Sequence, residues 1–290
     1  MRKSIVVGFV VASLALSACG VSASVKQSVA SLGASSDVQV LLTASFAGAG
    51  SAQAASILTG TSLDIHLANP SGAPLSQSTG QVDAEFIVKV AGTSFADIRS
   101  VGGNAYIYLD GSSLSSIPGL SFSAAQLVAA KLLLVGRWFE LPKSLITSMV
   151  PTNATTEAKQ AQAQAIERTI LDEVAKVIDS SKYTTLAGGG YSEIGSIQSI
   201  VNAVAPTIEN LTHSTASPVS LKGHYTLTLT NSGSTATGGS ISITAPSGSQ
   251  GNATGTLTAI VTHSSDPIVA PSGATIITPA LLQQLKSGSL

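Results

Sequence analysis

The sequence has few charged residues. Of its 290 residues, 14 are Lys or Arg and 15 are Asp or Glu, so charged residues make up 10%, against roughly 25% in an ordinary soluble domain. A formal net charge of −1 leaves no basic surplus for phosphate groups, which argues against nucleic-acid binding. The chain also has 44% hydrophobic residues, whereas disordered proteins usually combine few aliphatic residues with high net charge.

Motifs of common catalytic and metal sites are missing as well. The sequence has neither a Gly-x-Ser-x-Gly nor a His-Glu-x-x-His motif, and its four histidines are not spaced like metal ligands. We expect His66 and His224 to be exposed, and Asp83 with Glu85 to lie on a solvent face. The Gly48-Ala49-Gly50 run lacks the third glycine of a dinucleotide fingerprint. We therefore predict no catalytic residue, no metal site, no cofactor and no enzymatic activity.

The N-terminus has the pattern of an export signal. Arg2 and Lys3 precede an apolar run from Ile5 to Leu16. As a helix this run spans about 18 Å, which is too short for a hydrocarbon core of ~30 Å. A short apolar stretch between a positive start and small residues is typical of a removed signal peptide.

Cys19 is the only cysteine, so it has no disulfide partner within the chain. The preceding Leu16-Ser17-Ala18 and Cys19 together resemble a bacterial lipobox, in which the cysteine is acylated and becomes the first mature residue. We expect residues 1–18 to be removed and residues 19–36 to form a lipidated N-terminus with a short helix that stops at Gly33. The alternatives are a plain signal peptide that contains a cysteine, or a buried free thiol.

The mature chain alternates between apolar and polar residues in two blocks. This period of two predicts β-strands with one face in the core and a Ser- and Thr-rich face in water. The expected strands are 38–46, 63–67, 82–90, 95–101, 105–109, 136–141, 183–186, 225–229, 241–245 and 257–261.

Helical periods lie between these blocks. We expect helices over residues 123–134, 155–180 and 194–204, the last ending at Pro206. We expect residues 266–278 to be extended. The sequence therefore predicts an α+β fold, in which a single antiparallel sheet of about ten strands has three or four helices covering one face, as one domain over residues 37–290.

Three stretches resemble the LppX/LprG-type lipoproteins of mycobacteria and related actinobacteria. They are Gly80–Leu109, the Trp-bearing strand Gly136–Pro142, and the closing block Ser220–Ile277. The resemblance implies a curved, half-barrel-like sheet whose helix-lined concave face encloses a cavity for the acyl chains of glycolipids or lipoglycans. Residues 143–215 depart from the family by adding helix and Gly/Ser-rich loop.

Our leading hypothesis is therefore an exported lipoprotein on the outer face of the cytoplasmic membrane. It would bind a lipid or glycolipid between sheet and helices, and could transfer that lipid across the cell envelope. Phe86, Val88 and Leu227 are expected to line the covered apolar face, whether that face is a closed core or a cavity. The alternatives are a structural or partner-binding envelope lipoprotein with a closed core, and a hydrolase with an unrecognised site.

Overall fold

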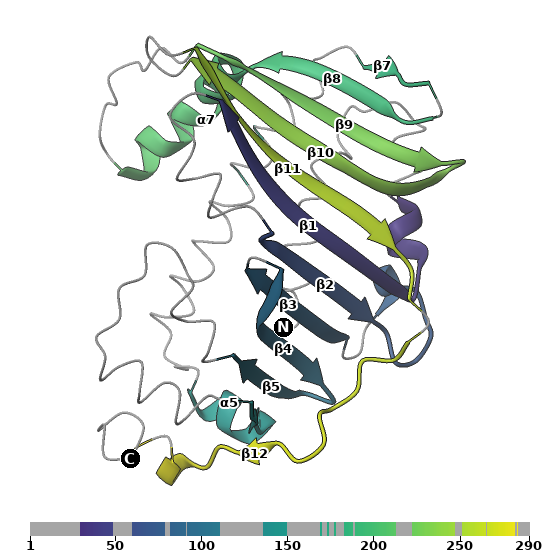
Figure 1. Cartoon of the computed structure of the whole chain (residues 1–290), viewed down its shortest axis with the longest axis vertical. Helices are drawn as coiled ribbons and strands as arrows, with labels where there is room; N and C mark the ends of the chain where they lie inside the picture. The colour runs from purple at the N-terminus through teal and green to yellow at the C-terminus, as the bar shows by residue number, and fades with distance from the viewer. Residues whose placement is uncertain are drawn as a thin grey trace. The chain divides into compact units, whose positions relative to one another are not determined.

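The computed structural model describes part of the chain (Figure 1). The described residues are 30–48, 60–78, 82–90, 92–110, 136–149, 169, 173, 177, 183–187, 189–212, 222–246, 251–264, 266–281 and 283. Cys19 and the helix expected over residues 123–134 lie outside them. Of the helix expected over residues 155–180, only residues 169, 173 and 177 are described, and all three are helical.

The chain divides into two compact units, which we describe separately. Unit 1 comprises residues 1–34, 45–55 and 152–261, and unit 2 comprises residues 35–44, 56–151 and 262–290. Strand β1 (Asp37–Gly48) contributes its first part to unit 2 and its last part to unit 1.

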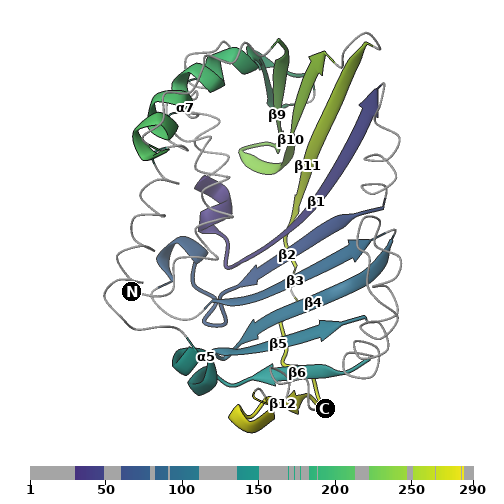
Figure 2. The same ribbon diagram turned by 90° about the vertical axis from the view of Figure 1, so that its left-hand side faces the viewer.

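The strands of unit 2 pair with their neighbours in sequence from β1 to β6 (Figure 2). After β1 they are β2 (Ser62–Ala68), β3 (Asp83–Val90), β4 (Thr93–Val101), β5 (Asn104–Leu109) and β6 (Trp138–Leu141), and β12 (Thr275–Ile276) lies beside β6. The short helices η1 (Leu75–Gln77) and α5 (Lys143–Met149) also belong to this unit.

The register of unit 2 aligns large apolar residues across the strands. One row crosses six strands through Val40, Ile65, Phe86, Ile98, Ile107 and Phe139. Since cross-strand partners share a face of a sheet, this row forms an apolar side. Val40 and Ile65 are buried, whereas Ile98 is 40% exposed, so the side is covered unevenly.

Unit 1 contains a second run of antiparallel strands. These are β7 (Thr184–Thr185), β8 (Tyr191–Ser196), β9 (His224–Ser232), β10 (Thr235–Pro246) and β11 (Asn252–Thr262). Helix α7 (Ile197–Thr212) follows β8 directly (Figure 1). A short helix at residues 30–34 ends one residue beyond the expected stop at Gly33, and its Leu32 is buried.

The expected sheet-dominated α+β architecture is confirmed. The described strands follow one hydrogen-bonded order, β12-β6-β5-β4-β3-β2-β1-β11-β10-β9-β8-β7, which gives twelve strands. Within each unit neighbouring strands pair antiparallel, except that β12 pairs with β6 in parallel. Strand β12 falls in the segment 266–278 that we expected to be extended.

The expected helix over residues 194–204 was wrong at both ends. Residues 191–196 form strand β8, because Tyr191, Glu193 and Gly195 pair in register with β9. Helix α7 then starts at Ile197 and continues past Pro206 to Thr212. Proline removes one backbone donor, but within a helix it can produce a kink without ending the helix.

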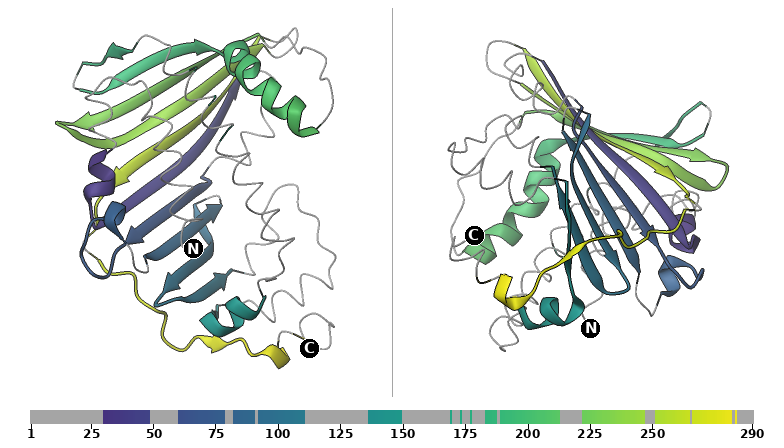
Figure 3. Two further views of the ribbon diagram at one scale, coloured as in Figure 1. Left: turned by 180° about the vertical axis from the view of Figure 1, so that it is seen from behind. Right: turned by 60° about the horizontal axis from the view of Figure 1, so that its bottom comes forward.

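The C-terminal segment crosses the polar side of unit 2 before it reaches β6 (Figure 3). The Ser264 amide donates to Asp37 Oδ1 at 2.7 Å, and Arg99 donates to the Val269 carbonyl at 3.2 Å. Ile268, between these two contacts, is only 7% exposed. The side that we expected to face water is therefore partly covered by the chain itself.

Candidate functional site

The apolar side of unit 1 is built by two cross-strand rows on β8 to β11. One row consists of Glu193, Leu227, Ile241 and Leu257, and the next consists of Gly195, Tyr225, Ile243 and Gly255. Partners in such rows point to the same face of the sheet. The alternation of apolar residues with Ser and Thr along β9 and β10 is what produces this face.

Several large side chains on this side remain accessible. Ile243 is 47% exposed and Leu257 is 46% exposed. Phe46 is 37% exposed, and its ring lies over Gly255, where an added Cβ would be 3.2 Å from the ring. We call Phe46, Ile243 and Leu257 the open apolar face. Because clustered exposed apolar groups are costly in water, such faces commonly mark binding sites.

The opposite side of the same strands carries mainly Ser and Thr, and its two exposed large apolar residues, Ile194 and Ile260, lie on the separate strands β8 and β11. Ser242 and Thr256 form a hydroxyl pair at 2.9 Å, and Thr244 and Thr254 form another at 2.9 Å. Hydroxyl pairs of this kind stabilise neighbouring strands without adding charge. This contrast identifies the side that carries Phe46 as the candidate ligand-binding side of unit 1.

A buried polar pair lies on the apolar side. The Tyr225 hydroxyl donates to Glu193 Oε1 at 2.6 Å, and both residues are 1% exposed. The Tyr225 ring lies across Gly195, where an added Cβ would be 2.2 Å from the ring. Only glycine at this position leaves room for the tyrosine to reach the carboxylate of the neighbouring strand.

The three apolar residues expected to line the covered face fall in different units. Phe86 and Val88 share one side of β3 in unit 2, whereas Leu227 lies on β9 in unit 1, opposite Glu193. All three are half-buried.

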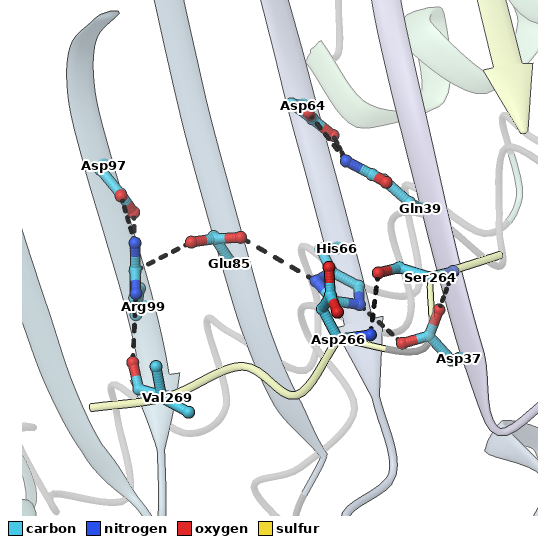
Figure 4. A network of polar contacts seen from close by, with 10 residues as sticks. All are labelled: Asp37, Gln39, Asp64, His66, Glu85, Asp97, Arg99, Ser264, Asp266 and Val269. Carbon is cyan, nitrogen blue, oxygen red and sulfur yellow. Dashed lines mark hydrogen bonds and ion pairs between the residues drawn. The ribbon is translucent and has the colours of Figure 1, made fainter. Parts of the chain in front are cut away.

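Unit 2 carries a charged network on its polar side (Figure 4). His66 Nε2 lies 2.6 Å from Asp37 Oδ2, and His66 Nδ1 lies 3.9 Å from Glu85 Oε2. Arg99 lies 2.8 Å from Glu85 and 2.9 Å from Asp97. The Arg99 guanidinium also stacks on Trp138, 4.8 Å from the ring centroid. Each group of this network has a partner within unit 2.

The surroundings shift the pKa values of two groups in this network. Burial raises the pKa of Glu85 above its ordinary value, and Asp97 and Asp64 add to this, although Arg99 and His66 oppose it. Burial acts to lower the pKa of Arg99, but the hydrogen bond from Arg99 to Asp97 and the charges of Asp97 and Glu85 outweigh it and raise the value. The network therefore holds Arg99 as a permanent cation between acidic partners.

Two expectations about this polar side were wrong. His66 is buried at 6% exposure, because the segment that contains Ser264 docks beside its partner Asp37. The Glu85 side chain is only 18% exposed, because it pairs with Arg99 on the adjacent strand. His224 is exposed at the start of β9, as expected.

Three further observations concern a surface hollow, metal ligands and membrane-spanning helices. A hollow of about 330 Å³ lies between the start of α5 and residues 276–279. Within the described ranges, no three His, Cys, Asp or Glu side chains are grouped so as to hold a metal ion. In the same ranges, no helix is long and apolar enough to cross a membrane.

No protein-family model matches the sequence, and no curated protein is significantly similar to it. The resemblance to the LppX/LprG-type lipoproteins therefore stays a prediction.

The pairing of Glu193 with Tyr225 was not predicted from the sequence. The alternation Tyr191-x-Glu193-x-Gly195, directly after a glycine run, was the available signal for a strand. The helix expected from Ile194 onwards overlaps this alternation, which in fact belongs to strand β8.

Proposed function

We propose that this chain is an exported lipoprotein, anchored to the outer face of the cytoplasmic membrane through acylated Cys19, that binds a lipid or other hydrophobic ligand. The ligand lies on the apolar side of the sheet and is held without covalent chemistry. Its acyl chains are shielded from water there during transfer across the cell envelope, in the manner of the family that the sequence resembles.

The open apolar face is the observation that supports this proposal. Phe46, Ile243 and Leu257 retain 37%, 47% and 46% exposure on the side of the sheet where a closed core would cover them. Covering apolar surface yields about 25 cal/mol per Å², or ~0.8 kcal/mol per buried methylene. An acyl chain laid on this face would gain that free energy at several methylenes at once.

We also propose the finer architecture that the family resemblance implies. In it the sheet is curved like a half-barrel, and three or four helices cover its apolar side and leave a cavity between sheet and helices. Phe86 and Val88 line that side in unit 2, and Leu227 lines it in unit 1.

Native mass spectrometry of the mature chain tests the function. Residues 19–290 carrying Cys19→Ser are purified without the anchor and examined for bound small molecules. A co-purifying lipid is the expected result. A chain that stays empty, and that takes up no lipid when lipids are added, would contradict lipid binding and favour the structural alternative.

A further inference from the structure

The carboxylate of Glu193 is only half satisfied. Its Oε1 accepts the Tyr225 hydroxyl at 2.6 Å. Its Oε2 is buried and has no hydrogen-bond partner among the residues that the structure describes. Buried polar atoms in folded proteins almost always have a partner, and an exception calls for an explanation such as a bound group.

Glu193 lies at one end of an apolar row. From β8 the row runs through Leu227 and Ile241 to Leu257 on β11, and exposure changes from 1% at Glu193 to 46% at Leu257. Three strand spacings separate these ends, which is about 14 Å. A row of apolar side chains with one polar group at its buried end matches the chemistry of a single-chain amphiphile.

We propose that Glu193 Oε2 is the hydrogen-bond anchor for a hydroxyl group of a neutral lipid, whose hydrocarbon chain extends over Leu227 towards the open apolar face. This inference rests on the proposed function, and it adds the polar end of the ligand and the residue that recognises it.

A hydroxyl group fits this oxygen better than other lipid head groups. It donates to a carboxylate and accepts from a carboxylic acid, so it pairs with Glu193 in either protonation state. No ion pair of Glu193 exists among the described residues. An anionic head group would therefore meet a second acidic group here without a compensating cation, which is unfavourable in a buried site. The chemical class is a hydroxyl-bearing neutral lipid such as a fatty alcohol or an acylglycerol.

Tyr225 and Gly195 act as positioning residues for this anchor. The hydrogen bond from Tyr225 fixes Oε1, so Oε2 is the oxygen left for the ligand. Gly195 permits the arrangement because any side chain there would collide with the Tyr225 ring.

The test compares two ligands of equal heavy-atom number, 1-hexadecanol and 1-chlorohexadecane, delivered from cyclodextrin and measured by calorimetry on the mature chain. The hydroxyl is expected to favour the alcohol by about tenfold, which is the upper end of what one net hydrogen bond contributes. Glu193→Leu should reduce this preference to about one while 1-chlorohexadecane still binds. Glu193→Gln, whose amide can still pair with a hydroxyl, should keep most of the preference.

Ile194→Ala is the matched control, because Ile194 lies on the opposite face of the same strand and is 69% exposed. It should leave both affinities unchanged. If Glu193→Leu binds both ligands with the wild-type preference, the proposed role of Glu193 is refuted, whereas lipid binding stands. If wild-type protein binds neither ligand nor any lipid in the mass-spectrometric test, both the anchor and the proposed function fail.

Discussion

The Tyr225 hydroxyl donates to Glu193 Oε1 at 2.6 Å, and its ring occupies the space that a side chain at Gly195 of the neighbouring strand would fill. The buried contact between Tyr225 and Glu193 therefore requires that residue 195 has no side chain. This relationship joins the packing of unit 1 to the only acidic residue on the two rows that form its apolar side.

Gly195→Ala should destabilise the protein. The new Cβ would lie 2.2 Å from the Tyr225 ring, so the ring must move and the bond to Glu193 must lengthen or break. We expect a loss of about 2 to 3 kcal/mol in the free energy of unfolding, measured with urea. Gly255→Ala is the control, because its Cβ would meet the accessible Phe46 ring at 3.2 Å, and that ring can shift. Equal losses for the two variants would contradict the argument.

Asp37→Ala should release the C-terminal segment from unit 2. The change removes the acceptor of the Ser264 amide and the 2.6 Å partner of buried His66. We expect a loss of about 2 kcal/mol in unfolding free energy, and faster hydrogen exchange at the Ser264 amide. Asp64→Ala removes a carboxylate that pairs with Gln39 on the same side, and it should leave the exchange of Ser264 unchanged. Unaltered exchange in Asp37→Ala would show that other contacts hold the segment.

Glu85 should make stability fall as the pH rises. Its folded-state pKa is raised above the ordinary value of 4.5, chiefly by burial. The folded state therefore binds the proton more tightly, and the stabilisation is complete below pH 4.5 and is lost as the pH rises through the raised pKa. The effect is measured by comparing the unfolding free energies of wild type and Glu85→Gln from below pH 4.5 to neutral pH. An NMR titration midpoint of Glu85 at or below 4.5 would refute it.

Leu257→Asn should weaken lipid binding without unfolding the chain. Leu257 belongs to the open apolar face, and losing its contact with a hydrocarbon chain should lower the affinity for 1-hexadecanol by about tenfold. Ile260→Asn is the counterpart, because Ile260 is 48% exposed on the same strand but points to the other face. Both variants should change the unfolding free energy by less than about 1 kcal/mol, since both side chains are accessible. Equal binding losses would disprove the assignment of the ligand to one face.

Cys19→Ser should detach the protein from the membrane. In a bacterium fed a clickable palmitate analogue, the wild-type chain should carry the label and sediment with the membrane fraction. The serine variant should lose both properties. Labelling that persists in Cys19→Ser would exclude this residue as the anchor.

Local periodicity was sufficient to predict most strands. The alternation from Val38 to Phe46, and the similar pattern of β2 and β3, reflects one buried and one polar side, which a sequence displays directly. The expected strands 241–245 and 257–261 are shorter than β10 and β11, because Gly, Ser and Thr give little contrast between the two sides of a strand.

The polar sites could not be predicted in this way. His66 is buried by a segment that follows it by about two hundred residues, and nothing near His66 in the sequence indicates that cover. The pairing of Glu193 with Tyr225 depends on strand register and on the space above Gly195. These contacts join residues that are far apart in the sequence, whereas helix and strand propensities depend only on neighbouring residues along the chain.

The two ends of the described strand order are the two-residue strands β7 and β12. A long terminal strand would offer a row of free amides and carbonyls on which another chain could continue the sheet. Each end strand has only two residues, so the end strands themselves offer little of that template. A protein that carries an accessible apolar face thus has its shortest strands at the positions where β-sheets most readily grow.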